Sequence, residues 1–382
     1  MKYSGLKFLV VGSGFWGSVF AQRIASVLNE KVLVIDKRNH IGGNSYSQKD
    51  ETTGIEYHKY GSHIFHTSSK RVWDFVNQFS EFNTYRHKVI TKHKDKYYSM
   101  PVNLETINSY YNLGLTPEEA RKFIAEKVMQ AGIVNPKNLE EKAISLIGKE
   151  LYSAFIKGYT IKQWGVNPSD LPSSIVERLP VRTSFDTSYF SDFYQGIPIN
   201  GYAKLFTKML EHENIDILLN VTYKDIKDQI PLECKIIYTG MLDELLDYKY
   251  GALEWRSLEF EYKSFNLRDF QGVAVLNYAD IDVPYTRTHE FKHFHPEKPH
   301  LFNAEKTFIS FEYPKIYLRG QDAYYPVNNH LNSQIYSKYY SEINDNLNII
   351  VGGRLGKYQY WNMDTTVENA LDAFENMCKN EY

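Results

Sequence analysis

The chain has 382 residues, and its 44 lysines and arginines nearly balance its 46 aspartates and glutamates. This balance gives no overall attraction to nucleic acid or to an anionic membrane, so we expect local basic clusters to bind any phosphate. The two cysteines, Cys234 and Cys378, exclude a disulfide framework and lack the spacing of metal ligands. No apolar run reaches membrane-spanning length, and we expect no signal peptide before the first predicted strand. We therefore expect a cytoplasmic protein of two or three domains with no membrane insertion.

The first predicted elements, over residues 8–36, form a dinucleotide-binding unit. Apolar runs predict two buried strands, and the second ends in Asp36, where a carboxylate can accept hydrogen bonds from a ribose. A glycine turn and an amphipathic helix lie between them. The first glycine permits the tight turn, the second lets a pyrophosphate approach, and the third lets the helix pack closely on the strand; they are Gly12, Gly14 and Gly17. This context favours a dinucleotide site over a glycine-rich turn without a ligand.

A second glycine pair, Gly42-Gly43, is followed directly by Asn44. In enzymes that bind nicotinamide dinucleotides, the region after the acidic residue usually carries no such pair. In flavoenzymes of the glutathione-reductase type, a loop of this kind lies against the phosphates and the ribityl chain of the cofactor. The pair therefore favours a flavin over a nicotinamide. Because the chain carries one dinucleotide fingerprint, we expect no second module that docks NAD(P)H.

The next segment, from about 104 to 165, has a helical pattern. Thr116-Pro-Glu-Glu119 is a capping box with proline at the first helical position, and Asn138 offers a second N-cap. Apolar residues at helical spacing follow both caps. We expect a helical insertion between parts of the nucleotide domain.

The remaining segments predict a return to the first sheet and a second group of strands. Apolar runs at 215–221 and 235–240 predict buried strands of the nucleotide domain, and residues 255–315 alternate as strands do. Residues 348–356 predict a strand that enters a glycine turn, followed by a helix that begins near Asp364. Such a turn and helix N-terminus would bring a second set of N–H donors to the cofactor.

Seven short blocks, in order along nearly the whole chain, resemble the bacterial UDP-galactopyranose mutases. Each block alone is modestly specific, but the series is not a coincidence. The blocks are Gly61-Ser-His-Ile-Phe-His-Thr67, Lys157-Gly-Tyr-Thr-Ile-Lys-Gln-Trp164, Arg178-Leu-Pro-Val-Arg182, Asp192-Phe-Tyr-Gln-Gly-Ile-Pro198, Val283-Pro-Tyr-Thr-Arg287, Tyr324-Tyr-Pro326 and Gly353-Arg-Leu-Gly-Lys-Tyr-Gln-Tyr360.

The resemblance implies an isomerase that uses reduced FAD without net redox change. Enzymes of that family interconvert UDP-galactopyranose and UDP-galactofuranose, which supplies galactofuranose for cell-surface glycans. In the mechanism implied, N5 of the reduced flavin attacks the anomeric carbon, expels UDP and forms a covalent flavin–sugar adduct. The resemblance also implies UDP-galactose as the substrate, an external reductant for the flavin, and a homodimer.

The resemblance and the predicted elements together give an α/β fold. It consists of a Rossmann-like FAD-binding domain, an inserted helical bundle and an antiparallel β-sheet domain. We predict a discontinuous FAD-binding domain over residues 1–80, 200–245 and 318–382. The helical substrate or lid domain is predicted over residues 98–180. The sheet domain is predicted over residues 81–97, 181–199 and 246–317.

The resemblance assigns site residues position by position. The implied catalytic residues are Arg178, Arg287 and His66. A diphosphate suits arginines because each guanidinium offers a planar, charged set of donors, and a surface or interdomain salt bridge is the alternative for each. The implied cofactor-binding residues are Gly12, Gly14, Phe15, Gly17, Asp36, Lys37, Gly43, Asn44, His63, Ile64, Val221, Arg354, Tyr360, Asn362 and Met363. The implied substrate-binding residues are His87, Phe155, Tyr159, Thr160, Trp164, Arg178, Tyr189, Asn277, Arg287, Tyr325 and Tyr360.

Some of these residues have simpler interpretations. His63 and His66 have the spacing of a metal pair, but no third ligand is apparent nearby, so we predict no metal site. Without the resemblance, Phe155 is typical of a helix core. Asn362 stands where the family often has an aspartate, which keeps the hydrogen bonding and loses a charge. Ser62 stands where the family commonly has proline, and we attach no functional meaning to it.

Two other functions are compatible with the N-terminal unit. A flavin oxidoreductase of the amine-oxidase or desaturase type would need a largely apolar tunnel, whereas the second half of this chain is rich in arginine and tyrosine. A binding protein like the GDP-dissociation inhibitors would use the fold without flavin. The intact glycine turn, Gly42-Gly43 and Arg354 disfavour that second alternative, since they have little purpose without the dinucleotide.

Overall fold

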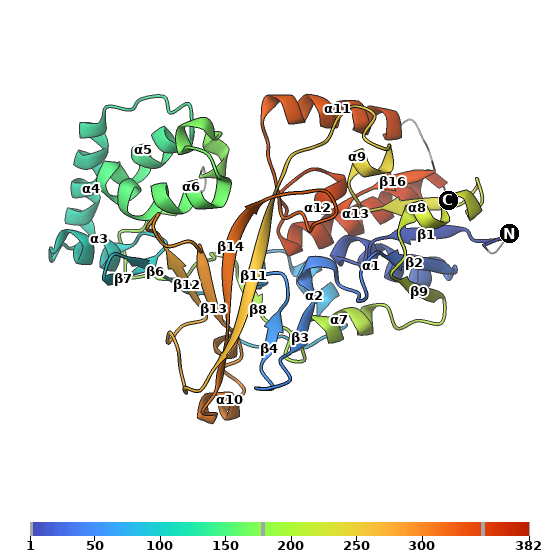
Figure 1. Cartoon of the computed structure of the whole chain (residues 1–382), viewed down its shortest axis with the longest axis horizontal. Coiled ribbons are helices and arrows are strands. Elements are labelled where there is room, and N and C mark those ends of the chain that lie inside the picture. Colours follow the sequence, from blue (N-terminus) through green and yellow to red (C-terminus); the bar gives the residue numbers. More distant parts are fainter. Residues whose placement is uncertain (1–2, 177–179, 345–347, 382) are drawn as a thin grey trace.

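The first sheet has five parallel strands in the order β16-β10-β1-β2-β9 (Figure 1). The computed structural model describes residues 3–176, 180–344 and 348–381. The strands are β1 (Phe8–Val11), β2 (Val32–Asp36), β9 (Ile215–Leu219), β10 (Lys235–Tyr238) and β16 (Ile349–Val351). This order confirms the predicted Rossmann-like α/β fold. The prediction that 215–221 is buried is wrong for part of β9, which is an edge strand with Asp216 and Ile217 exposed.

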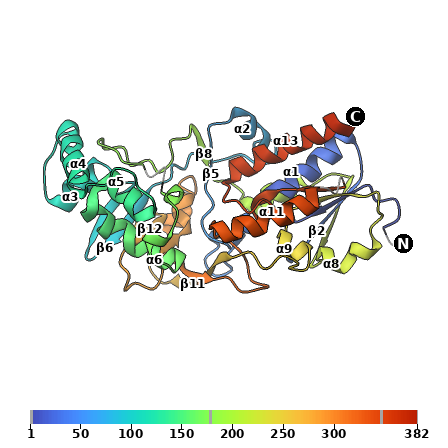
Figure 2. The same cartoon turned by 90° about the horizontal axis from the view of Figure 1, so that it is seen from above.

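Helices cover both faces of this sheet. Figure 2 shows α1 and α13 side by side, and they share an apolar core with α2 and α7. These helices are α1 (Phe15–Arg23), α2 (Lys70–Val76), α7 (Tyr202–Met209) and α13 (Met363–Glu381). The opposite face packs on α8 (Tyr223–Ile226), α9 (Leu242–Leu245), α11 (His330–Asn344) and α12 (Gly353–Gly356). Among the described residues, no helix combines the length and the apolar character that crossing a membrane requires.

The second sheet has seven strands in the order β15-β11-β14-β13-β12-β6-β7. They are β6 (Val89–His93), β7 (Lys96–Met100), β11 (Trp255–Phe265), β12 (Val275–Tyr278), β13 (Arg287–Glu290), β14 (Thr307–Ile316) and β15 (Tyr325–Pro326). The predicted antiparallel sheet is mixed in fact, because β6 and β12 pair in parallel. A parallel pair needs a long crossover, and the chain between β6 and β12 passes through the helical unit and the first sheet.

Four helices form a unit beside β6 and β7 (Figure 1). They are α3 (Leu104–Tyr111), α4 (Pro117–Ala131), α5 (Leu139–Leu151) and α6 (Gly158–Trp164). Both predicted caps are confirmed, since Thr116 and Glu119 form a reciprocal capping box and Asn138 accepts the N–H of Glu141. The division into three domains stays a prediction. Within it, β15 falls in the range 318–382 assigned to the nucleotide domain, yet it pairs with β11.

Two small antiparallel sheets and a short helix lie outside the units described so far. Strand β3 (Ser47–Lys49) pairs with β4 (Glu56–His58), and β5 (Phe65–Thr67) pairs with β8 (Tyr194–Gly196). Helix α10 (Pro299–Asn303) lies at the far end of the long β11–β14 ribbon (Figure 1). The pairing of β5 with β8 matters for the site, because it brings residues from the first and second halves of the chain together.

Candidate functional site

A cavity of about 470 Å³ opens where β1, β2 and β10 end. Its lining includes Gly12 after β1, residues 36–38 at the end of β2, and Thr239 after β10. Ligands of doubly wound sheets bind at this carboxyl edge of the strands. Its volume lies within the range that is usual for sites that bind small molecules and cofactors.

The two glycine motifs of the sequence face each other in this cavity. Gly12 has a φ of +98°, and a Cβ there would overlap Thr239, while a Cβ on Gly17 would overlap the carbonyl oxygen of Gly12. Gly14 is different, since the nearest atom to a Cβ placed there is the Gly43 Cα at 3.9 Å. The first and third glycines therefore serve the fold, whereas the second leaves backbone open to a ligand beside the N-terminus of α1.

Asp36 and Arg38 organise the floor of the cavity. The Asp36 carboxylate accepts the N–H of Ser13 at 2.8 Å and the N–H of Arg38 at 2.9 Å, which fixes the glycine turn. Arg38 donates to Asn44 at 2.7 Å and to Asp322 at 2.5 Å, and its guanidinium lies 4.2 Å from the Tyr60 ring centroid. Burial opposes the charge, but Asp322 raises the pKa of Arg38 above its ordinary value. The sequence did not single out Arg38, because Asp322 is far away along the chain.

Most of the predicted cofactor residues come together here. Those that line the cavity are Gly12, Gly14, Phe15, Gly17, Asp36, Lys37, Gly43, Asn44, His63, Val221, Arg354 and Met363. Ile64, Tyr360 and Asn362 are not in its lining, although the Arg354 guanidinium lies 4.6 Å from the centroid of the Tyr360 ring. Open glycine backbone, a helix N-terminus and basic side chains are the donor set that a dinucleotide requires, so the residues present fit FAD.

Arg287 lies in the second sheet, at the start of β13, and pairs with Glu312 of β14. Its Nε and one terminal nitrogen each donate to the Glu312 carboxylate at 2.9 Å. The Glu312 side chain is fully buried, whereas that of Arg287 is 25% exposed. Burial opposes the charge on Arg287, but Glu312 raises its pKa well above the ordinary value. The guanidinium is therefore a permanent cation with one edge held and the other open.

Three tyrosines lie within electrostatic reach of the Arg287 guanidinium. Its charge acts on the hydroxyls of three tyrosines drawn from α6, the loop before β8, and β15: Tyr159, Tyr189 and Tyr325. Burial raises the pKa of all three, so they are neutral donors at physiological pH. Tyr360 completes the group, with its ring 5.3 Å from that of Tyr325. The predicted Arg178 lies outside the described residues.

The residues predicted to bind the base differ in their surroundings. Phe155 is buried against Tyr98 and Tyr110, with ring centroids 4.9 and 5.5 Å away, as its interpretation as helix core requires. Trp164 is half-buried and Thr160 is buried on α6. Asn277, on β12 next to Arg287, has a buried Oδ1 with no hydrogen-bond partner among the described residues. A buried acceptor of this kind calls for a donor from a ligand or water.

Burial keeps His63 and His87 neutral, and His66 pairs with a carboxylate. His63 interacts through Nδ1 with the Gly61 carbonyl at 2.7 Å, and burial lowers its pKa to about 4. Burial, with Arg287 and His66 nearby, lowers the pKa of His87 to about 3. His66 contacts the Asp192 carboxylate through Nδ1 at 2.6 Å. The sequence missed Asp192 as a site residue; its only signal was a place in a resembling block.

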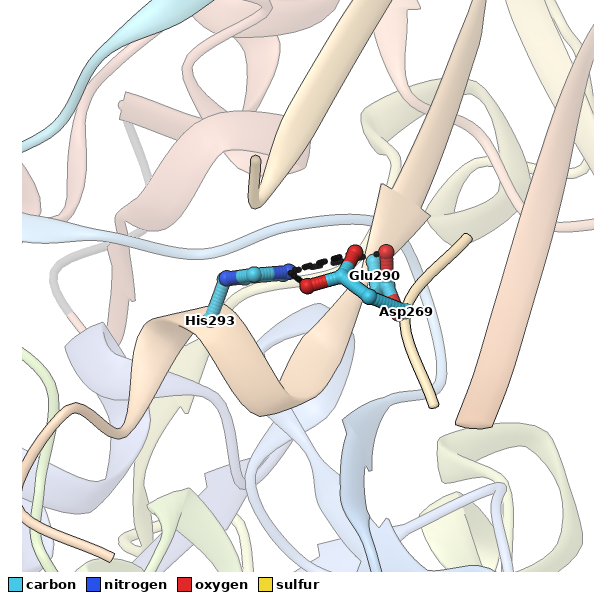
Figure 3. Close-up of side chains that lie close together, drawn as sticks. All are labelled: Asp269, Glu290 and His293. Carbon is cyan, nitrogen blue, oxygen red and sulfur yellow. Dashed lines mark hydrogen bonds and ion pairs between the residues drawn. The ribbon is translucent and has the colours of Figure 1, made fainter. Parts of the chain in front are cut away.

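A separate cluster of titratable groups lies near the start of β14 (Figure 3). His293 contacts Asp269 at 3.2 Å and Glu290 at 3.5 Å through Nε2. The buried Glu290 also accepts two backbone N–H groups and the Thr307 hydroxyl, and Lys292 lies 3.2 Å from it. Because these donors and a buried cation already satisfy the carboxylate, we interpret the cluster as a structural tie and not as a metal site.

Comparisons with known proteins agree on one family. Residues 154–360 match the family described as UDP-galactopyranose mutase, and residues 10–79 match an NAD(P)-binding Rossmann-like domain. A probable UDP-galactopyranose mutase of Klebsiella pneumoniae is 42% identical over 363 residues, which cover 95% of this chain and 92% of the relative. A dTDP-fucopyranose mutase of Escherichia coli is 40% identical over 378 residues, covering 98% of this chain and 99% of that one.

Solved structures show a similar fold. A crystal structure of reduced UDP-galactopyranose mutase superposes with a TM-score of 0.74 at 15% identity, covering 98% of this chain and 96% of the other. A putative protoporphyrinogen oxidase from Exiguobacterium sp. 255-15 has a TM-score of 0.65 at 11% identity, with 99% and 100% coverage. At these identities the likeness concerns the fold alone.

Proposed function

Because the chain belongs to the UDP-galactopyranose mutase family, we propose that it is an isomerase that interconverts UDP-galactopyranose and UDP-galactofuranose. The observation that carries the proposal is the partly exposed guanidinium of Arg287, held along one edge by Glu312 and acting on the hydroxyls of three tyrosines. A permanent cation and neutral hydroxyl donors suit the diphosphate of a nucleotide sugar, which must be held while it is detached from the sugar. This donor set disfavours the apolar tunnel of an amine oxidase.

We propose FAD as the cofactor, bound in the cavity beside Gly14 and Gly43. Reduced FAD, when bound, supplies an electron-rich ring nitrogen as the nucleophile for the anomeric carbon. The glycine turn and the N-terminus of α1 would bind its pyrophosphate, and Asp36 would bind a ribose. Arg354 lies in the cavity lining, where a cation would favour the reduced, electron-rich flavin. An external reductant and a homodimer complete the proposal, both on the strength of the family.

The chain's other residues would position the substrate. Arg287 and the tyrosines would hold the diphosphate, with Arg178 proposed as a second cation. Asn277 would use its unpartnered amide oxygen on the pyrimidine edge, and Trp164 would lie against the nucleoside. His63, neutral because burial lowers its pKa to about 4, would stand between cofactor and sugar without adding charge.

A second candidate substrate is dTDP-fucopyranose. The relative from Escherichia coli with that name is 40% identical and covers nearly the whole chain, close to the value for the Klebsiella relative. The two substrates share the diphosphate and the hydrogen-bonding edge of the pyrimidine. They differ at C6 of the sugar, at C5 of the base and at the 2′-hydroxyl of the ribose. The residues proposed above serve the shared parts, so both substrates stay candidates.

A panel of sugar nucleotides separates these candidates. The purified protein is expected to be yellow and to release FAD on denaturation. After reduction with dithionite it is incubated with UDP-galactofuranose and, separately, with dTDP-fucopyranose, and products are resolved by anion-exchange chromatography. Conversion of the UDP sugar supports the main proposal, and conversion of the dTDP sugar alone supports the second. A colourless protein, or turnover of neither sugar, would overturn both.

A further inference from the structure

His66 and Asp192 form an ordered carboxylate–imidazole pair next to the proposed substrate site. The Nδ1 of His66 lies 2.6 Å from one oxygen of Asp192, and the Ser68 hydroxyl donates to the other oxygen at 2.6 Å. The imidazole stacks on Phe190, with ring centroids 3.6 Å apart and planes 13° apart. Gln195, opposite His66 in the β5–β8 pair, donates to the Asp192 carbonyl at 2.7 Å. These contacts therefore fix the orientation of both the His66 imidazole and the Asp192 carboxylate.

This arrangement leaves the second nitrogen of His66 available. An acceptor on Nδ1 keeps one proton there in both charge states of the imidazole, so Nε2 is the nitrogen that can lose and regain a proton. No described residue makes a hydrogen bond to Nε2, and the side chain of His66 is 11% exposed. Phe65 points into the apolar core, so its neighbour His66 points to the opposite face of the strand. On that face His66 and Arg287 both act electrostatically on His87.

The proposed reaction requires two proton transfers that balance. In the pyranose the ring oxygen is O5, and in the furanose it is O4. When the C1–O5 bond breaks, its electron pair goes to O5, which gains a proton. When the C1–O4 bond forms, O4 loses its hydroxyl proton. A protonated imidazole can give a proton to O5 when the C1–O5 bond breaks, and the neutral imidazole left behind can take the O4 proton when the C1–O4 bond forms. One group is therefore sufficient, and it ends the turnover in the protonation state in which it began.

We propose that His66 exchanges these protons through Nε2 and that Asp192 is the positioning residue that fixes its tautomer and stabilises its charged form. The inference rests on the proposed function and deepens it. Asp192 touches neither substrate nor cofactor in this account; it acts through His66, as the buried carboxylate acts in hydrolase triads. Ser68 contributes through its hydroxyl, which donates to the second oxygen of Asp192 and fixes the orientation of the carboxylate. The same role applies to either candidate substrate, because both exchange O5 for O4.

The test is the variant Asp192→Asn, assayed as reduced holoenzyme with the substrate that the wild type turns over. We expect kcat to fall roughly 100-fold, the usual size of an acid–base contribution. KM should stay within about threefold, because no contact with the substrate is removed. The pH dependence of kcat should also change, since the proton-exchanging group loses its carboxylate. Flavin content and Tm serve as measures of an intact fold.

Three further variants make the result decisive. Asp186→Asn, an exposed acid on the same loop that pairs with Arg182, should leave kcat and its pH profile unchanged. His66→Gln combined with Asp192→Asn should be no slower than His66→Gln alone, because the carboxylate acts only through the imidazole. Ser68→Ala should lower kcat by a few-fold with the same change in pH profile, and it tests the idea if Asp192→Asn does not fold.

Several outcomes would overturn the inference. Wild-type kcat in Asp192→Asn, or a fall in kcat with an unchanged pH profile, would show that Asp192 has no part in proton exchange. Additive losses in the double variant would show that it acts independently of His66. These outcomes leave the proposed function standing, provided that the wild type turns over a sugar nucleotide. Failure of the wild type on both sugars would overturn the proposed function and this inference together.

Discussion

Replacing Arg287 by methionine should affect stability and turnover through two separable causes. The side chain of Glu312 is fully buried and its carboxylate receives two bonds of 2.9 Å from Arg287. In Arg287→Met the Thr286 hydroxyl, at 3.1 Å, is the one side-chain donor that this carboxylate keeps among the described residues. Arg287→Met therefore leaves an uncompensated buried charge and also removes the proposed diphosphate ligand. A second substitution, Glu312→Met, removes the first effect without repairing the second.

The size of the stability effect follows from burial. Removing one partner of a buried pair typically costs about 3–5 kcal/mol. The Arg287 side chain is 25% exposed, so water can reach part of the vacated space, and we expect a loss near the lower end, about 3 kcal/mol. The double variant should recover to within about 1 kcal/mol of the wild type, because apolar side chains of similar volume replace such pairs at little cost. Thr286 then keeps the backbone carbonyl of Glu312, at 3.3 Å, as an acceptor.

Urea unfolding and steady-state turnover separate the two causes. Both variants should retain flavin, and both should lose at least about 100-fold in kcat/KM, because a charged hydrogen bond to the diphosphate is absent in each. Lys315→Met is the matched control on the same sheet. It breaks an exposed pair with Glu259, whose side chains are 46% and 57% exposed, and should cost less than about 1 kcal/mol. Wild-type turnover in the double variant would refute the ligand role of Arg287, and failure to recover stability would refute the reasoning about Glu312.

Three further predictions test the site. His87→Gln should reduce the loss of stability that urea unfolding shows between pH 6.5 and 4 by up to about 1.4 kcal/mol per pH unit. Burial lowers the pKa of His87 to about 3, so the unfolded chain takes up its proton first, and an unchanged slope would contradict this reasoning. Gly14→Ala should weaken FAD binding, measured by flavin retention, with little change in the stability of the apoprotein. Gly17→Ala should instead destabilise the apoprotein by more than about 1 kcal/mol. A loss of stability in Gly14→Ala without one in Gly17→Ala would contradict the assignment of the two glycines. Asn277→Ala should raise KM about tenfold with kcat nearly unchanged, and an unchanged KM would mean that its amide does not meet the base.

Local sequence signals predicted the parts of the structure that local physics determines. The caps at Thr116 and Asn138 involve residues within three positions of each other, so the sequence contains the whole interaction. The glycine turn was equally readable, since a positive φ at Gly12 and close packing at Gly17 require glycine whatever surrounds them. These signals were sufficient for the Rossmann-like unit and for the cavity beside it.

Features that depend on the return of distant segments could not be predicted in the same way. The parallel pairing of β6 with β12 joins segments separated by the helical unit, and no alternation pattern encodes the direction of pairing. The bond from Arg38 to Asp322 and the contact of His66 with Asp192 likewise join residues far apart in the chain. A family resemblance supplied His66 but not its partner, because residues that act through another residue leave no distinctive motif of their own.

Arg287 has two interpretations, a salt bridge and a proposed ligand of a diphosphate, and the two are compatible. A guanidinium has five N–H donors in a planar fork, and the bonds to Glu312 use two of them along one edge. The remaining three point away from that edge, and the charge of the guanidinium acts on the hydroxyls of Tyr159 and Tyr325. The ion pair fixes the plane of the fork and keeps the charge permanent, which is what a diphosphate ligand needs before substrate arrives. The salt bridge is thus a condition for the proposed ligand role, and an arginine without Glu312 would be both less ordered and a poorer anion site.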